Sequence, residues 1–157
     1  QMPSLRKYLQ KAITLPRLRL VLELKRLNSA QRETEAVRQI VNMVNTYGLS
    51  DRTDYISFSL HAVKEFIRFA PNADVYYLDG DLSPMELKEL GAAGLDYALS
   101  PLKKNPNWIK EAHELGMKVN SWTINKEKNI KWLIEQGVDF ITTDEPVRVL
   151  EMVNRKD

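Results

Sequence analysis

The chain alternates between short apolar runs and longer segments in which apolar residues recur at helical spacing. The longer segments place apolar side chains three or four positions apart, as in Val37, Ile40 and Val44, which is typical of an amphipathic helix. The short runs resemble Tyr55-Ile56-Ser57-Phe58-Ser59 and indicate strands. The pattern predicts strands over residues 18–25, 55–59, 73–78, 97–100, 118–123 and 140–142, and helices over residues 31–47, 63–70, 84–93, 107–115, 130–136 and 146–153.

Residues that begin or end helices mark the boundaries of these segments. Ser83 and Glu86 form a predicted capping box, with Pro84 at the first helical position. A glycine precedes each of the last three predicted strands, and we expect each to lie just after a helix end: Gly94, Gly116 and Gly137. Regular alternation of strand and helix without hairpin signals favours a parallel sheet with helices outside it.

The first predicted strand, residues 18–25, carries two charged side chains near its carboxyl end. Its apolar residues form an almost unbroken run, which is typical of a strand covered on both faces. Glu23 and Lys25 are two positions apart, so both side chains lie on the same face of the strand. An ionised group inside such a strand is costly unless it is paired, hydrated or bound to a ligand. The two residues therefore either form an internal ion pair or belong to a binding site.

Two architectures agree with six strand-helix units: an open doubly wound α/β sheet and part of an eight-unit TIM (β/α)8-type barrel. An open sheet normally has a glycine-rich phosphate loop after its first strand, whereas residues 24–28 contain no glycine. Polar residues lie at the end of every predicted strand, as expected for a site shared at the carboxyl face of a barrel. They are Glu23, Lys25, Ser57, Ser59, Tyr77, Asp79, Ser100, Asn120, Trp122, Thr143 and Asp144.

We therefore predict a single domain over residues 1–157, an incomplete α/β barrel of about six βα units. A complete barrel needs roughly 200 or more residues, so two units are expected to be absent from this chain. Absent strands would leave unpaired sheet edges and exposed apolar surface, which predicts self-association into a dimer or larger assembly.

The bulk composition excludes several classes of protein. The 157 residues have 43% hydrophobic content, enough for a sizeable core, and a formal net charge of +2 from 23 basic and 21 acidic residues. This balance gives no long-range field that would attract nucleic acid. No apolar stretch approaches the ~20 residues of a spanning helix, so we expect no integral membrane protein. The absence of cysteine excludes disulfides and a thiol nucleophile and leaves the compartment open.

Three motifs together resemble the glycerophosphodiester phosphodiesterase family. They are Leu22-Glu23-Leu24-Lys25, Trp122-Thr123-Ile124-Asn125 and Thr143-Asp144-Glu145-Pro146, in the order and at the spacing of the family. Residues 2–9 are similar to the helix that precedes the family's third strand, and residues 56–59 to its fourth strand. The resemblance covers essentially the whole chain, and it implies a (β/α)8 barrel of which this chain has strands three to eight.

The resemblance also implies roles for three residues. Glu23 is similar to the family's third-strand metal ligand, and the implied cofactor is a divalent cation, Ca²⁺ or Mg²⁺. Lys25 is similar to the family's phosphate-contacting lysine, which would balance charge on the non-bridging oxygens. Trp122 is similar to a residue that forms a wall for the glycerol or alcohol part of the substrate, with Asn120 on the same face of its strand. For a tryptophan, core packing is the alternative.

Four further polar residues near strand ends are expected to have lesser or structural roles. Asn125 is predicted to cap the helix that follows it, and Asp144 is predicted to cap the last helix. Ser57 and Ser59 are weaker candidates for hydrogen bonds at the rim of the site.

Hydrolysis of glycerophosphodiesters to glycerol 3-phosphate and an alcohol, with a metal cofactor, is the function that the resemblance implies. The family's two catalytic histidines and two of its three acidic metal ligands belong to motifs that do not occur in this sequence, which has no His-Arg-Gly and no His-Asp pair. His61 and His113 match neither family histidine, so we expect the isolated chain to be inactive. The alternatives are a non-catalytic binding or scaffold protein derived from the same barrel, and an unrelated phosphate-binding α/β domain.

Overall fold

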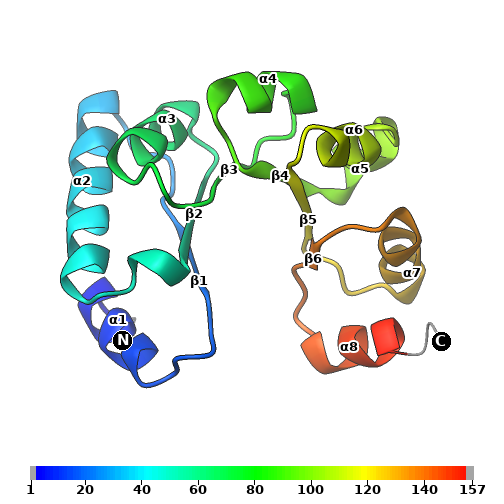
Figure 1. Ribbon diagram of the computed structural model, residues 1–157, viewed down its shortest axis with the longest axis horizontal. Coiled ribbons are helices and arrows are strands. Elements are labelled where there is room, and N and C mark those ends of the chain that lie inside the picture. Colours follow the sequence, from blue (N-terminus) through cyan, green and yellow to red (C-terminus); the bar gives the residue numbers. More distant parts are fainter. Residues whose placement is uncertain (1–2, 155–157) are drawn as a thin grey trace. The chain divides into compact units, whose positions relative to one another are not determined.

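The computed structural model describes residues 3–154, which divide into two compact units, one up to Tyr76 and one from Tyr77 on. Strands and helices alternate along both units, in agreement with the pattern of the sequence (Figure 1). The single domain over residues 1–157 stays a prediction. Among the described residues, no helix is both long and apolar enough to cross a membrane.

The unit up to Tyr76 contains two complete βα pairs. Its elements are α1 (Leu5–Ile13), β1 (Leu20–Glu23), α2 (Ala30–Thr46), the 3₁₀ turn η1 (Ser50–Arg52), β2 (Thr53–Ser57), α3 (Leu60–Phe69) and all but the last residue of β3 (Val75–Tyr77). β1 and β2 are parallel, and Glu23 lies beside Ile56. The hydroxyl oxygens of Ser4, Ser29 and Ser59 accept backbone hydrogen bonds that cap α1, α2 and α3.

The core of this unit lies between its strands and helices. α2 and α3 pack against each other beside β1 and β2 (Figure 1). Val37 and Val44 of α2 are fully buried, and the ring of Tyr55 on β2 stacks on Phe66 of α3 with 4.5 Å between centroids. Burial raises the pKa of Tyr55 to about 12. Since Tyr55 points to the helices, its strand neighbour Ile56 points to the opposite face, together with Glu23.

β1 is shorter and more exposed than the sequence predicts. It spans only Leu20–Glu23, and Leu20 is buried whereas Val21 is 55% exposed. The prediction of a strand covered on both faces is therefore wrong. Alternation explains the difference, because Leu20 shares the helix-facing side of its neighbour Thr53 while Val21 and Glu23 lie on the other face. Apolar residues on both faces indicate a strand, but they do not show that both faces are covered.

The unit from Tyr77 on contains the remaining strands and five helices among its described residues. These elements are α4 (Pro84–Leu90), β4 (Gly94–Ala98), α5 (Leu99–Lys104), α6 (Trp108–Glu114), β5 (Lys118–Trp122), α7 (Glu127–Gln136), β6 (Phe140–Ile141) and α8 (Pro146–Asn154). β5 pairs in parallel with β4 on one side and β6 on the other. Tyr97 of β4 faces Trp108 of α6, with 6.2 Å between ring centroids, so this side of the strands is covered by helices.

Two boundaries near Gly94 differ from the prediction. The capping box of Ser83 and Glu86 is present, but α4 ends at Leu90 and is followed by Gly91, whose φ of 86° is left-handed, instead of continuing to Gly94. Gly94 instead begins β4, and a Cβ atom there would lie 1.9 Å from the carbonyl oxygen of Lys118 on β5. The close approach of two backbones therefore explains this glycine.

The helix α5 has no counterpart in the sequence pattern. The strand expected over residues 97–100 ends at Ala98, and the chain turns directly into α5 at Leu99. The helix has only 6 residues, which is too short for an apolar repeat to become visible, although Leu102 is fully buried.

Candidate functional site

Glu23 and Lys25, the two charged residues of the first motif, lie together at the carboxyl end of β1. The ammonium Nζ of Lys25 is 2.6 Å from Oε1 of Glu23, so the two side chains form an ion pair on one face, as their spacing predicts. Nζ also lies 5.9 Å from the centroid of the Phe58 ring, just beyond β2. The structure thus places a positive and a negative group side by side next to an aromatic surface.

The Glu23–Lys25 ion pair is open to solvent. The side chain of Lys25 is 75% exposed and that of Glu23 is 28% exposed. The ion pair is therefore not an internal one, because β1 has only one covered face. An exposed ion pair contributes only about 0–1 kcal/mol to stability. Replacing the contact to Glu23 by a contact to an anionic ligand would consequently cost Lys25 little.

The backbone between these two residues is held firmly by β2. The amide of Leu24 donates to the carbonyl oxygen of Ile56 at 3.0 Å, and the carbonyl oxygen of Leu24 accepts from the hydroxyl of Ser57 at 2.7 Å. Ser57 is fully buried. It therefore supports the backbone beside Lys25, rather than forming a bond at the rim as the sequence suggested.

The irregular segment that follows β1, residues 24–27, is here called the β1 exit segment. A buried carboxylate holds its far end: Oε1 of Glu33 accepts from the amide of Leu27 at 3.0 Å, and Oε2 accepts from the hydroxyl of Ser59 at 2.6 Å. Ser59 is also buried and not at a rim. In addition, the guanidinium of Arg26 donates to the carbonyl oxygen of Phe58 at 2.7 Å. The exit segment is thus fixed to the loop after β2 at several points.

Glu33 is a residue that the sequence analysis missed. It is 4% exposed, and it occupies the buried stripe of α2 together with Val37, Val41 and Val44. An acidic residue at a position where the helical period calls for an apolar one was the available signal. Such a residue needs hydrogen-bond partners, and partners for α2 near its amino end lie in the loops that follow β1 and β2.

Trp122 lies on β5 in the unit from Tyr77 on, so the structure describes it separately from Glu23 and Lys25. It is half-buried, and its indole N–H donates to the backbone carbonyl oxygen of Asp96 on β4 at 2.9 Å. Asn120, on the same face of β5, donates to Oδ1 of Asp96 at 2.7 Å and to the hydroxyl oxygen of Thr142 at 2.9 Å. These polar groups form a row across β4, β5 and the end of β6, and the row fixes the indole.

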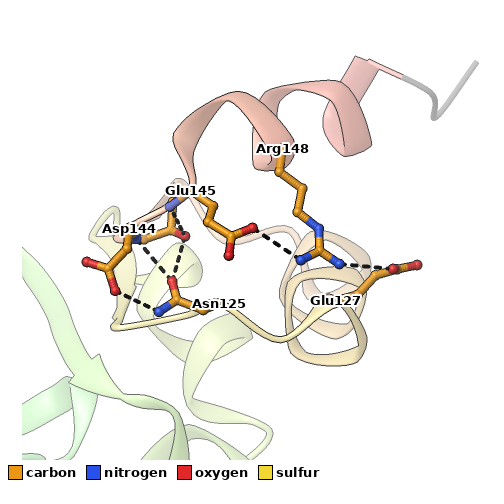
Figure 2. A network of polar contacts seen from close by, with 6 residues as sticks. Asn125, Glu127, Asp144, Glu145 and Arg148 are labelled. Carbon is orange, nitrogen blue, oxygen red and sulfur yellow. Dashed lines mark hydrogen bonds and ion pairs between the residues drawn. The ribbon is translucent and has the colours of Figure 1, made fainter.

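Asn125 and Asp144 join the loops that follow β5 and β6 (Figure 2). The amide of Asn125 donates to Oδ2 of Asp144 at 2.7 Å, while its oxygen accepts from the backbone amide of Asp144 and the hydroxyl of Thr143, both at 3.0 Å. The predicted cap is wrong for Asn125, because the residue before α7 is Lys126. Glu145 directly precedes α8, so Asp144 is one position too early for its predicted cap. Sequence spacing cannot distinguish a cap from a bond between loops, since both need a short amide or carboxylate near a helix start.

An ion-pair network links α7 and α8 beside these loops (Figure 2). Arg148 contacts carboxylate oxygens of Glu145 and Glu127, each at 3.2 Å. Lys131 also pairs with Glu127 at 2.7 Å. The contacts to Lys131 first, and then to Arg148, lower the pKa of Glu127. The network is exposed and supports the geometry of the two helices.

The two histidines contact neither Glu23 nor Lys25 among the interactions of the described residues. Nε2 of His61, on α3, is 2.9 Å from the hydroxyl of Thr34 on α2. Nε2 of His113, on α6, is 3.0 Å from Oδ2 of Asp139. Both contacts are those of helix-surface residues.

The chain's described residues supply one carboxylate for a metal ion at the end of β1. Within residues 3–154, no group of three or more His, Cys, Asp or Glu residues is arranged to hold a cation. Glu23 has the oxygen donors that Ca²⁺ and Mg²⁺ prefer, but these ions need several such ligands. Glu23 alone therefore does not make a metal centre.

Comparison with known proteins gives the same family as the motifs. The model of the glycerophosphoryl diester phosphodiesterase family matches residues 2–148. A glycerophosphodiester phosphodiesterase from Caldanaerobacter subterraneus is 23% identical over 74% of this chain, and one from Bacillus altitudinis is 25% identical over 90%. The aligned regions are 49% and 63% of those two proteins, so this chain spans only part of the length of its relatives.

Solved structures agree closely with the fold. A glycerophosphodiester phosphodiesterase from Parabacteroides distasonis matches with a TM-score of 0.97 and 46% identity, over 98% of this chain and 65% of that one. A structure from Silicibacter pomeroyi described as a glycerophosphoryl diester phosphodiesterase matches with a TM-score of 0.87 and 27% identity, over 98% of this chain and 56% of that one. The predicted fold class, an incomplete TIM-type barrel of six βα units, is confirmed. The chain belongs to the glycerophosphoryl diester phosphodiesterase family.

Proposed function

We propose that the protein hydrolyses glycerophosphodiesters to glycerol 3-phosphate and an alcohol. The observation that carries this proposal is 46% identity, over 98% of the chain, with a solved glycerophosphodiester phosphodiesterase. Each unit, taken by itself, has a residue that suits part of such a substrate. In the unit up to Tyr76, Lys25 offers a cation for a phosphate, and in the unit from Tyr77 on, Trp122 offers an apolar surface for the organic part.

Lys25 is the proposed phosphate-binding residue. Its ammonium group is exposed, and its present partner Glu23 belongs to a surface ion pair of small net stability. A phosphate oxygen would take the place of the contact to Glu23 and gain a charge-assisted hydrogen bond. In the reaction, the same positive charge would stabilise the negative charge that develops on the non-bridging oxygens.

Trp122 is the proposed wall for the glycerol or alcohol part of the substrate. Its half-buried ring leaves part of the indole accessible, and the bond from Nε1 to the carbonyl oxygen of Asp96 fixes the ring plane. A fixed aromatic surface favours the CH groups of glycerol at little cost in conformational entropy.

A divalent cation, Ca²⁺ or Mg²⁺, is the proposed cofactor, with Glu23 as one of its ligands. Bound beside the phosphate, it would neutralise charge on the phosphate oxygens. The described residues supply Glu23 and no complete ligand set, so the other ligands would have to lie outside residues 3–154. For the same reason, and because the family's histidine motifs do not occur in this sequence, we propose that the 157-residue chain alone is inactive.

Glycerol 3-phosphate is the natural probe for this site. A phosphodiesterase from Oleispira antarctica, which shares this fold with a TM-score of 0.79 and 23% identity, was solved in complex with the product sn-glycerol-3-phosphate. We propose that this chain binds the same compound through Lys25. We further propose that the chain self-associates through the exposed face and edge of β1, where Leu18 and Val21 are each 55% exposed.

The test combines binding and hydrolysis. Isothermal titration calorimetry with sn-glycerol 3-phosphate is expected to show binding that Lys25→Met weakens about tenfold or more, whereas Lys25→Arg, which keeps the charge, retains most of the affinity. The full-length product of the gene is expected to release glycerol 3-phosphate from glycerophosphocholine or glycerophosphoethanolamine with Mg²⁺ or Ca²⁺. Binding without any release by that full-length product would overturn the enzyme and support the scaffold alternative. Release by the 157 residues alone would overturn their proposed inactivity.

A further inference from the structure

We propose that Glu33 is a positioning residue for Lys25, whose buried carboxylate fixes the β1 exit segment and so places the ammonium group for a phosphate. The inference rests on the proposed function, in which Lys25 binds the substrate phosphate. Within the described residues, the hydrogen bonds of the Glu33 carboxylate go to Leu27 and Ser59 and not to Lys25 or Glu23, so Glu33 would act through the backbone.

Both oxygens of Glu33 are used, and both partners belong to loops at the carboxyl ends of strands. Oε1 accepts from the amide of Leu27 at 3.0 Å, and Oε2 accepts from the hydroxyl of Ser59 at 2.6 Å. Ser59 follows β2, and Leu27 follows β1. The carboxylate, which is 4% exposed, therefore ties the two loops together behind the strand end that carries the ion pair. Its place in the first turn of α2 also suits a negative charge.

A second path leads from Glu33 to the residue between Glu23 and Lys25. Ser59, held by Glu33, donates its backbone amide to the hydroxyl oxygen of Ser57 at 3.0 Å. The hydroxyl of Ser57 in turn donates to the carbonyl oxygen of Leu24 at 2.7 Å. The β1 exit segment is thus anchored at Leu24 and at Leu27, on either side of Lys25. The anchor at Leu27 is Glu33 itself, and the anchor at Leu24 combines the path through Ser57 with the bond from the Leu24 amide to Ile56.

Packing alone does not account for an acidic residue at position 33. The buried stripe of α2 continues with Val37 and Val41, and an apolar side chain at 33 would extend it without the cost of removing a carboxylate from water. The hydrogen-bond partners of Glu33 explain why this position is acidic. These bonds fix the irregular part of the β1 exit segment beyond Leu24, which carries the charged end of the site.

Arg52 provides a matched control at the opposite end of the same strands. Its guanidinium donates to the carbonyl oxygens of Ala12, Leu15 and Leu18 at 2.8, 2.9 and 2.7 Å, ahead of β1. Arg52 therefore anchors irregular backbone with charge-assisted bonds, as Glu33 does, but away from Lys25. Arg52→Ala and Glu33→Ala are both expected to destabilise the unit up to Tyr76. Only Glu33→Ala is expected to change the position of Lys25 as well.

The first measurement is amide hydrogen exchange of the protein without ligand. Glu33→Ala removes the acceptor of the Leu27 amide, so exchange at Leu27 is expected to rise by at least about tenfold. The amide of Leu24, which donates to Ile56 on β2, serves as the internal reference. Glu33→Gln keeps an acceptor for Leu27 and can donate to the hydroxyl oxygen of Ser59, and it is expected to restore protection. Unchanged exchange at Leu27 in Glu33→Ala would overturn the inference without reference to any ligand.

The second measurement is the affinity for sn-glycerol 3-phosphate by calorimetry, at a temperature where circular dichroism shows every variant folded. Glu33→Ala is expected to weaken binding about tenfold, as loss of a residue that orients a ligand-binding group typically does. Glu33→Gln and Arg52→Ala are expected to stay within about twofold of wild type. In a background of Lys25→Met, Glu33→Ala is expected to have no further effect, because the group that it positions is gone.

These measurements separate the inference from the proposed function. If wild type does not bind the probe, or if Lys25→Met binds as well as wild type, the proposed function fails and this inference fails with it. If Lys25→Met weakens binding but Glu33→Ala does not, or if Arg52→Ala weakens it equally, only the inference is overturned. Ser57→Ala, which cuts the path at Leu24 without changing the carboxylate, is expected to weaken binding in the same way and serves if Glu33→Ala does not fold.

Discussion

Gly94 is the position at which the smallest possible change is expected to damage the fold most. It begins β4 beside Lys118 of β5, and its φ does not lie in the left-handed region. A Cβ atom added there would lie 1.9 Å from the carbonyl oxygen of Lys118 and 2.8 Å from its carbonyl carbon. Both atoms belong to backbone, which cannot move aside by changing a rotamer. Gly94→Ala therefore requires the two strands to separate.

The size of the effect follows from the distances. Carbon and oxygen atoms in contact between strands normally lie at about 3.3–3.6 Å, so the backbones must move apart locally by roughly 1.4 Å or more. The bond from the Lys118 amide to the carbonyl oxygen of Ala93, now 3.1 Å, would then be well beyond hydrogen-bond length. A broken buried bond costs about 1–3 kcal/mol, and overpacking a further 1–3 kcal/mol or so. Alanine also restricts the unfolded chain, which stabilises the protein by about 0.4–1 kcal/mol. We therefore expect the free energy of unfolding to fall by about 3 kcal/mol in total.

Urea unfolding followed by circular dichroism measures this loss, and Gly116→Ala is the matched control. Gly116 has φ +71° and no atom within 4 Å of an added Cβ, so alanine there is strained but meets nothing. The strain is worth about 1–2 kcal/mol. With a slope near 2 kcal/mol per molar urea, the midpoint of Gly94→Ala should fall by about 1.5 M, and that of Gly116→Ala by about 0.5–1 M. Equal midpoints for the two variants would refute the close-approach explanation of Gly94.

Two other predictions concern pH and assembly. The hydrogen bonds from Ser83, first the hydroxyl and then the backbone amide, lower the pKa of Glu86 below its ordinary value of 4.5. The stability that Glu86 contributes is therefore present above the unfolded-state pKa and is lost as pH falls through the lower folded-state pKa. Glu86→Gln should be less stable than wild type at neutral pH in urea unfolding, and the difference should shrink as the pH is lowered. A difference that does not change with pH would contradict this. In analytical ultracentrifugation, the 157-residue chain should sediment as a dimer or larger species. Val21→Lys, which places a charge on the exposed face of β1, should shift the chain toward monomer. A wild-type monomer at micromolar concentration would contradict self-association.

The sequence predicts the order of strands and helices well because apolar period is a local property. Residues 31–47 differ from α2 by one residue at each end, and residues 118–123 differ from β5 by one residue at the end. The predictions are wrong where the same local pattern agrees with two different surroundings of a residue. Val21 is apolar, yet whether anything covers it depends on the neighbours of β1, and Gly94 resembles a helix-ending glycine until the backbone of Lys118 is seen beside it.

In the candidate site, too, only the local features could be predicted from the sequence. Glu23 and Lys25 were predicted on one face because alternation along a strand needs no knowledge of the rest of the fold, and they form an ion pair there. Their exposure and their supports were not predicted. Glu33 lies eight or more positions from either residue and acts through Leu27 and Ser59, so no short motif contains it. Only its acidic character on an apolar stripe is visible in the sequence.

Within each unit, the loop after one strand is held by the loop after the next strand. In the unit up to Tyr76, Ser57 and Ser59, which end β2 and begin α3, hold the β1 exit segment. In the other unit, the oxygen of Asn125 after β5 accepts from Thr143 and from the amide of Asp144 after β6. Ser57, which holds the backbone beside Lys25, lies 33 positions after Leu24, one βα unit along the chain. Trp122 differs, because its indole N–H is held by the carbonyl oxygen of Asp96 on the preceding strand β4. It follows that a change of specificity at Lys25 has to preserve the polar residues of the following unit, whereas a change at Trp122 has to preserve the backbone of β4.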